Sequence, residues 1–462
     1  RRGPTGSPAH RTGLTSSNLN HLSLNMLKEP LMGDVSSAGI LRWRRTIFLV
    51  TFVNYAMAHF CRKCYTNVKT ELVEDGVDQV ILSQMDTAFM LTYAVGTFIS
   101  GRLGDMYPQN IIIAIGLVGS TACLVFILFL DRLRVVQWNH SLGFSLFVLA
   151  QFIHGFFQST GVPVNTAVMG NWFSKKGRGF IFGLWSCHQF LGDILAALAT
   201  AWIVGAGSPW QWALLLPATL NGVWGALNLC YLPNSPAEVG LASSVEKTTA
   251  SDGGGAIGFV QAVRIPGVIG YSLAYGFLKF INYAMFFWLP FFLSLHFDTE
   301  SANMISSLYS LGMMPGGVIV GWVSDLLGGR RATVVGAFLL VLAPLLWLFA
   351  MYADEMPPLI LLALLGMLGV LVGGPNNIIT SAVAVDLAEH PSIGGNARSL
   401  GTVTSIINGT GGITAALGLM IIGPLQQVGG WTAVWYLLIA CVVVCIAILG
   451  KKIVNELSGN KE

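Results

Sequence analysis

The sequence predicts an all-α membrane protein in which twelve spanning helices form two pseudo-symmetric six-helix bundles. Three observations support this fold class. Of the 462 residues, 54% are hydrophobic and only 10% are charged, apolar stretches of spanning length recur along the chain, and the second half repeats features of the first. A chain with this composition and a mean hydropathy of +0.67 is too apolar for one or two soluble domains.

Twelve stretches are long and apolar enough to cross a bilayer. A spanning helix needs ~20 mostly apolar residues, because its backbone polar groups must be satisfied within the segment. The 54 glycines agree with this interpretation, since small residues let membrane helices approach closely. The predicted spans are 44–68, 84–106, 110–130, 143–169, 178–204, 211–232, 266–294, 302–324, 332–352, 358–385, 398–424 and 430–450.

The positive charges predict an orientation. If the spans alternate across the membrane, most of the 25 Lys and Arg residues fall on the side of the termini, and the opposite loops keep only Lys69, Arg132 and Arg134. Cytoplasmic loops retain positive charge, so we expect a multi-pass protein with both termini in the cytoplasm. A sequon at Asn139-His140-Ser141 then lies on the opposite side, where glycosylation is possible.

An internal repeat divides the chain. Glycine and acidic residues near the end of the second span return about 220 residues later, near the end of the eighth, and the second copy continues into two arginines. Such helix ends can pack closely and pair an acid with a base, which would latch one access state; the simpler alternative is ordinary loop charge beside helix ends. The candidate gating residues are Gly101, Asp105, Gly321, Asp325, Arg330 and Arg331.

The repeat also sets the expected domain boundaries. A stretch rich in Pro, Ser and Gly separates the two halves, as expected for a flexible linker. The expected parts are a disordered cytoplasmic tail over 1–41, a first bundle over 42–232, a cytoplasmic linker over 233–256, a second bundle over 257–451 and a cytoplasmic tail over 452–462. An organellar transit peptide is the alternative for the first of these.

Three basic residues lie inside apolar spans: Arg62, Lys63 and Lys279. A basic side chain at the bilayer centre costs ~2.5–3.5 kcal/mol on insertion scales, so it persists where it faces a cavity or a partner. One structural alternative is that Arg62 or Lys279 pairs with Asp193 in a buried salt bridge. Another is that Arg62 and Lys63 extend to the membrane interface.

The functional interpretation is that Arg62 and Lys279, one from each bundle, meet near the midplane as a binding site for an anion. A guanidinium binds phosphate bidentately and an ammonium acts as a point charge. Two desolvated like charges should hinder the empty carrier from switching between access states, which predicts exchange rather than free movement. The candidate substrate-binding residues are Arg62, Lys279, Lys63, Tyr55, His188, Gln189, Tyr93 and Asn282.

Several runs resemble a known family. They include Phe60-Cys61-Arg62-Lys63 in the first span, Gly170-Asn171-Trp172-Phe173 before the fifth, and the long stretch from Gly374-Pro375 to Gly418. Over roughly 42–450 the chain resembles the organophosphate:phosphate antiporters of the major facilitator superfamily, most closely the sugar-phosphate exchanger and plant glycerol-3-phosphate permease branch. The resemblance implies the major facilitator fold, and it implies that Arg62 and Lys279 bind substrate phosphate.

The expected function is exchange of an organophosphate, of the hexose phosphate or glycerol 3-phosphate class, for inorganic phosphate by rocker-switch alternating access. The alternatives are a carrier of nitrate or a carboxylate, or a non-transporting sensor. No P-loop, G-x-S-x-G or H-E-x-x-H motif is present, so we expect no enzyme activity, and we expect no cofactor and no metal. The expected partners are substrate, inorganic phosphate and lipid, with no nucleic acid, and the protein is expected to act as a monomer.

Overall fold

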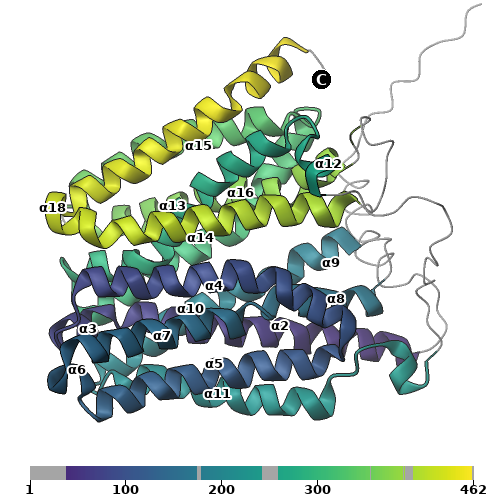
Figure 1. Ribbon diagram of the computed structural model, residues 1–462. Helices are drawn as coiled ribbons and strands as arrows, with labels where there is room; N and C mark the ends of the chain where they lie inside the picture. Colours follow the sequence, from purple (N-terminus) through teal and green to yellow (C-terminus); the bar gives the residue numbers. More distant parts are fainter. Residues whose placement is uncertain are drawn as a thin grey trace, which may run out of the picture.

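The computed structural model describes residues 38–173, 178–241, 259–353, 355–388, 390 and 399–459. Helices account for nearly all of these residues and form two groups, drawn below in purple to teal and above in green to yellow in Figure 1. We call the end of the molecule where α2 begins and α18 ends the terminal face. The other end, which carries α3 and α6, is called the opposite face.

The first group comes from the first half of the chain. Its third to sixth spans contain helices apolar enough to cross a membrane, and the fourth and fifth spans are each built from two consecutive helices. The helices are α2 (Ala38–Asn67), α3 (Lys69–Glu74), α4 (Gln79–Met106), α5 (Gln109–Arg132), α6 (Val135–Trp138), α7 (His140–Gln158), α8 (Gly161–Trp172), α9 (Arg178–Trp185), α10 (His188–Gly205) and α11 (Gln211–Tyr231).

The second group follows a 3-10 turn, η1 (Pro236–Val239). The tenth span of the chain contains a π-helical turn, η2 (Ile379–Val383). The eleventh and twelfth spans are continuous except at Gly430, where a positive φ of 65° turns the chain back. The helices are α12 (Phe259–Val263), α13 (Val268–Ser294), α14 (Thr299–Leu326), α15 (Arg331–Tyr352), α16 (Pro358–Ile378), α17 (Ala384–Ala388) and α18 (Ser399–Ser458).

Helices occupy every predicted span within the described residues, and nine of the described helices meet the length and hydropathy needed to cross a membrane. The more polar α2 and α4 are not among the nine; they carry Arg62, Lys63 and Asp86. The tails and most of the linker, namely 1–37, 242–258 and 460–462, lie outside the described residues.

The pseudo-symmetry is visible in the helix caps. Asp78 caps α4 by accepting a hydrogen bond from the backbone N–H of Val80 at 2.6 Å, and Asp298 caps α14 by accepting one from Ser301 at 2.9 Å. The bond from Ser301 lowers the pKa of the Asp298 carboxyl below its ordinary value. The two aspartates are separated by the same offset as the glycine and acid repeat, so both bundles start their second long helix in the same way.

Glycines allow α4 and α18 to approach closely where the two groups meet. A Cβ at Gly412 would lie 2.6 Å from the Cβ of Ala94, and one at Gly423 would lie 2.7 Å from Ser83 Oγ. Such distances are too short for any side chain beyond hydrogen, so these glycines permit the contact between the bundles.

Candidate functional site

A central cavity of about 260 Å³ lies between the two groups of helices. Its lining combines α2, α4 and the start of α10 on one side with α13, α14, α16 and α18 on the other. A second hollow of about 340 Å³ shares Tyr93, Val162, Lys279 and Asn408 with it and continues towards Gly101 and Thr404. The cavity therefore extends from the centre of the molecule towards the terminal face.

Lys279 lines both parts of this cavity from α13. Its ammonium lies 3.5 Å from the carbonyl oxygen of Asn408 and 5.3 Å from the centre of the Tyr275 ring. No carboxylate among the described residues lies within ion-pair distance of it. Neither the carbonyl nor the aromatic face is a full negative charge, so these contacts leave the ammonium without a counter-ion.

Arg62 lies beside this cavity but does not line it, since its side chain is only 1% exposed. Its guanidinium lies 4.6 Å from the ring centre of Tyr93 and 5.1 Å from that of Phe89, and Tyr55 and Tyr283 are also close to it. Nη2 donates to Gln158 Oε1 at 3.1 Å, whereas Nε and Nη1 have no hydrogen-bond partner. The arginine is thus charged, partly unsatisfied and covered by aromatic residues.

Arg62 and Lys279 come from different bundles, on α2 and α13. They lie close enough for their charges to repel each other, and neither is paired with an acid among the described residues. Of the two, Lys279 lines the cavity and Arg62 does not; the guanidinium of Arg62 lies against Tyr93, which does line it.

Lys63 occupies a different place from the one expected of a substrate ligand. It is not among the residues that line the cavity, and its ammonium donates to the carbonyl of Phe286 on α13 while lying 4.4 Å from the centre of that ring. Lys63 therefore joins the two bundles. The side chain does not extend to the membrane interface either, since it is 4% exposed.

Five of the other predicted residues line the cavity: Tyr55, Tyr93, His188, Gln189 and Asn282. The hydroxyls of the first two lie 3.0 Å apart, and Asn282 accepts from Tyr309 at 3.1 Å. His188 stands at the start of α10, where the fifth span is interrupted after Trp185. Both of its ring nitrogens lack a hydrogen-bond partner although it is 3% exposed, which marks it as a group that needs a ligand or water.

Among the described residues, Asp193 is the single acid in the lining of the cavity. Its Oδ1 lies 2.9 Å from Nδ1 of His59, one helical turn before Arg62 on α2. The buried pairing of Asp193 with Arg62 or Lys279, considered from the sequence, is therefore wrong: the partner is a histidine. The acid stays near the cations without being bonded to either.

Sequence reasoning missed much of the second bundle's contribution. The polar residues there come from α13, α14, α16, η2 and α18, and the asparagines in apolar helices were the signal that could have identified them. A π-helical turn such as η2, which carries Thr380, is common at functional sites. The missed lining residues are Tyr275, Tyr309, Ser310, Asn376, Asn377, Thr380 and Asn408.

Several hydrogen bonds join the two bundles towards the opposite face. Besides that of Lys63, these include the bond between Thr70 Oγ1 and Ser294 Oγ at 2.6 Å, the bond from the backbone N–H of Gly423 to Ser83 Oγ at 2.7 Å, and the bond from Gln427 to Asp78 at 3.0 Å. The opposite face is thus held closed, while the cavity extends the other way.

A buried ion pair lies within this closed region. Lys69 and Asp86 are 2.5 Å apart with both side chains fully buried, and the Lys69 ammonium lies 4.1 Å from the centre of the Trp288 ring in the other bundle. The sequence placed Lys69 in a loop on the side opposite the termini, whereas the residue begins α3 and is buried. The lysine packs into the interface because Asp86 and an aromatic face from α13 replace its water.

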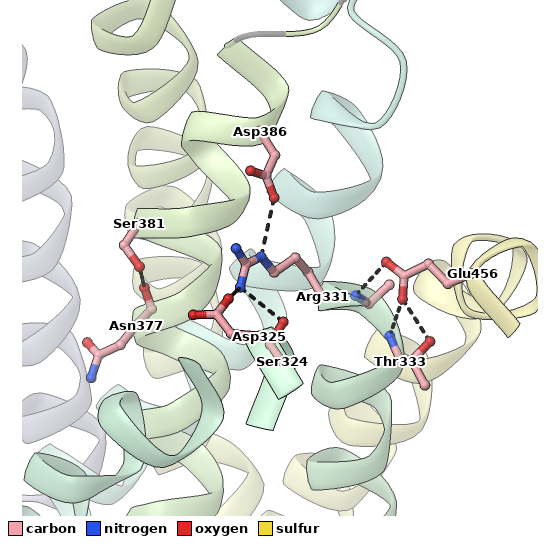
Figure 2. A network of polar contacts seen from close by, with 9 residues as sticks. Ser324, Asp325, Arg331, Thr333, Asn377, Ser381, Asp386 and Glu456 are labelled. Carbon is pink, nitrogen blue, oxygen red and sulfur yellow. Dashed lines mark hydrogen bonds and ion pairs between the residues drawn. The ribbon is translucent and has the colours of Figure 1, made fainter. Parts of the chain in front are cut away.

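At the terminal face, Arg331 connects the second copy of the repeated motif (Figure 2). It forms ion pairs with Asp325 at 2.7 Å and Asp386 at 3.3 Å, which agrees with the predicted pairing of an acid and a base. Glu456, at the end of α18, accepts hydrogen bonds from the backbone N–H groups of Ala332 and Thr333 and so caps α15. Arg330 is exposed beside this network.

The predicted close packing at the repeated glycines does not occur in this conformation. A Cβ at Gly321 would meet no atom within 4 Å, and one at Gly101 would meet only Pro163, at 3.8 Å. The side chain of Asp105 lies outside the described part of the structure. Both glycines are at the terminal face, where the bundles are apart.

Comparison with known proteins identifies the relatives of this chain. The sequence matches the Major Facilitator Superfamily over 48–396 and 293–460. It is 32% identical to the putative glycerol-3-phosphate transporter 1 of Arabidopsis thaliana, covering 90% of this chain and 89% of that protein. It is 34% identical to sugar phosphate exchanger 3 of Gallus gallus, covering 89% and 92%, and 32% identical to that of Homo sapiens, covering 89% and 93%.

Solved structures agree on the fold. A bacterial homologue of the human lysosomal transporter Spinster, in an inward-facing and unoccupied conformation, superimposes with a TM-score of 0.64 at 14% identity, covering 90% of this chain and 97% of that one. The nucleoside transporter NupG gives a TM-score of 0.64 at 13% identity, covering 88% and 98%.

Proposed function

This chain belongs to the Major Facilitator Superfamily, a family of membrane transporters rather than enzymes, and we propose that it exchanges an organophosphate for inorganic phosphate. The relatives named as glycerol-3-phosphate transporters and sugar phosphate exchangers support an organophosphate substrate. The exchange and its mechanism are inferred from the arrangement of charges.

The observation that carries this proposal is the presence of two cations, one from each bundle, without an acid of their own among the described residues. Lys279 lines the cavity, and Arg62 lies beside it with two unpartnered guanidinium nitrogens. Buried charges of one sign are unfavourable until a counter-charge arrives. A phosphate dianion supplies that charge and accepts several hydrogen bonds at once.

The tyrosines over Arg62 fit an ordered binding process. A phosphate first meets Lys279 and the hydroxyls of Tyr55 and Tyr93, both of which line the cavity. As the terminal face closes, Arg62 reaches the same phosphate with Nε and Nη1. Polar groups of the second bundle, among them Asn282 and Tyr309, face the organic part of the substrate.

Exchange follows from the cost of moving the empty carrier. Closing the terminal face would desolvate Lys279 beside Arg62, and no described carboxylate neutralises either one. Loading with either phosphate species removes the repulsion, so both directions of movement require a bound anion. The two bundles then move as rigid units about the cavity, with the terminal face on the cytoplasmic side.

Counterflow in proteoliposomes tests the proposal. Vesicles loaded with unlabelled inorganic phosphate should accumulate labelled phosphate, and external glucose 6-phosphate, glycerol 3-phosphate or phosphoenolpyruvate should compete according to specificity. Nitrate and acetate serve as anions of other classes. Uptake that is indifferent to internal phosphate, or that nitrate inhibits and phosphate does not, would refute the exchange of phosphates.

A further inference from the structure

A buried polar network lies behind Arg62, away from the cavity. It is formed by Gln151, His154 and Gln158 on α7 and Ser120 on α5, each of them 3% exposed or less. None of these side chains lines the central cavity. Polar groups inside spanning helices are unfavourable unless paired, so a chain of four of them beside one cation needs a reason.

The chemistry of the donors fixes the orientation of Gln158. A guanidinium can only donate hydrogen bonds, so the group that meets Nη2 of Arg62 at 3.1 Å must be the amide oxygen. Both amide hydrogens then have acceptors: the carbonyl of Ala58 at 3.0 Å and Ser120 Oγ at 2.9 Å. Ala58 lies one turn before Arg62 on α2. Gln158 therefore hydrogen-bonds both to the side chain of Arg62 and to the backbone of α2, the helix that carries Arg62.

Two further hydrogen bonds extend the network from Ser120 to His154 and from His154 to Gln151. Ser120 Oγ accepts from Gln158 and lies 2.8 Å from Nε2 of His154, to which it donates its hydrogen. Nδ1 of His154 then carries the ring proton and donates to Gln151 Oε1 at 3.1 Å. A neutral histidine satisfies each bond. A protonated one would leave the Ser120 hydrogen without an acceptor and place a second charge behind Arg62.

We propose that Gln158, held in place by Ser120 and His154, is a positioning residue that orients the Arg62 guanidinium for the substrate anion. The amide fixes Nη2 and leaves Nε and Nη1 without partners. Because the amide is neutral, it holds the guanidinium without the negative charge that would compete with a phosphate. This inference rests on the proposed function for the identity of the anion.

A structural role alone would give different results. If the network only joins α2, α5 and α7, breaking it lowers thermal stability and leaves anion affinity unchanged. If it positions Arg62, breaking it weakens binding of the anion even where the protein stays folded. Ser120 is the best site for this test, because it touches neither Arg62 nor the cavity.

The experiment compares four variants of the full chain in detergent: Ser120→Ala, Ser120→Thr, Gln158→Met and Gln158→Glu. Gln158→Met should raise the dissociation constant for inorganic phosphate roughly tenfold, the size expected when a hydrogen bond to a charged group is lost. Ser120→Ala removes only the bond that holds the Gln158 amide, so it should raise the dissociation constant by a smaller factor. Ser120→Thr keeps the hydroxyl and should bind like the wild type. Gln158→Glu should bind weakest of all, because its carboxylate pairs with Arg62.

A second readout needs no substrate. Arg62 is modified with an arginine-directed dicarbonyl reagent and the modified residue is located by mass spectrometry. Ser120→Ala should accelerate modification of Arg62, and Ser120→Thr should not. If the wild type binds no phosphate, the proposed function fails, and the modification rates still test the network.

Unchanged phosphate affinity and unchanged Arg62 modification in Ser120→Ala and Gln158→Met would overturn the proposal, as would lowered thermal stability alone. Wild-type affinity in Gln158→Glu would also overturn it, since a carboxylate at that position could not leave Arg62 free.

Discussion

Nδ1 of His59 and Oδ1 of Asp193 lie 2.9 Å apart, and this contact joins α2 to α10 at the wall of the central cavity. Asp193 lines the cavity, and its bonded partner is an imidazole. A salt bridge to Arg62 or Lys279 would have neutralised the charge that an anion needs. The histidine instead holds the acid in place while both cations remain without a carboxylate among the described residues.

Replacing Asp193 with asparagine should keep or raise affinity for phosphate. The amide can still hydrogen-bond to His59, so the contact between α2 and α10 survives, while one negative charge leaves the cavity. Phosphate binding to the purified variant measures the effect, with Asp131→Asn at the opposite face as a matched control. A variant that fails to fold would show that the charged carboxylate is needed for the structure through its contact with His59.

Removing either cation should abolish exchange. Arg62→Ala and Lys279→Ala each delete half of the positive charge at the proposed site, so the loaded carrier gains too little from the anion to close around it. Counterflow with labelled phosphate measures the loss, and size-exclusion chromatography checks that the variants are folded. Lys451→Ala, an exposed lysine in α18, is the control and should exchange normally. Normal uptake by either cavity variant would contradict the site.

The fold was predictable because its determinants are local. Apolar length sets each span, and the repeat of Gly101 and Asp105 as Gly321 and Asp325 sets the two-bundle arrangement. The site was predictable in part, since a buried cation inside an apolar span implies a cavity or partner. Which of these occurs depends on tertiary packing. Burial of Arg62 under tyrosines from three helices cannot be inferred from spacing along α2.

The burial of Lys69 also depends on tertiary packing and could not be predicted from the sequence. Its position between two helices resembled a loop, and only the approach of Asp86 and Trp288 makes it a fully buried residue. Asn376, Asn377 and Asn408 were missed because they lie on two separate helices, α16 and α18, with no common period in the sequence. Contacts between distant elements decide these features, whereas hydrophobic length decides the spans.

Breaking the pair of Lys69 and Asp86 should destabilise the protein strongly. Removing one partner leaves a buried charge uncompensated, which typically costs about 3–5 kcal/mol. Thermal unfolding of Asp86→Ala and Lys69→Ala measures this loss. The double variant Lys69→Met, Asp86→Leu should be more stable than either single variant, since no charge is left unpaired. Single variants as stable as the wild type would contradict the burial of the pair.

Locking the closed face should stop exchange. The hydroxyls of Thr70 and Ser294 lie 2.6 Å apart across the bundles, so cysteines at these two positions should form a disulfide in this conformation. Oxidation should then block counterflow, because the opposite face cannot open, and a reducing agent should restore it. Each single cysteine variant serves as a control. A cross-linked protein that still exchanges phosphate would show that the bundles do not separate there.

Glycosylation of Asn139 tests the orientation of the molecule. The residue is exposed at the opposite face, where its side-chain oxygen accepts from the backbone N–H of Leu142 at 3.0 Å and its amide nitrogen remains accessible. With the termini in the cytoplasm, the sequon Asn139-His140-Ser141 faces the lumen of the secretory pathway, so expression in mammalian cells should add a glycan.

Enzymatic removal of N-glycans should then increase mobility on a denaturing gel, and Asn139→Gln should abolish that shift. The second sequon, Asn408-Gly409-Thr410, lies in α18 with Asn408 at the cavity wall, where the transferase cannot reach, so Asn408→Gln should leave the shift intact. A sequon engineered into the 233–241 segment at the terminal face should stay unmodified. Modification of the engineered sequon in place of Asn139 would reverse the orientation, because the two positions lie on opposite sides of the membrane.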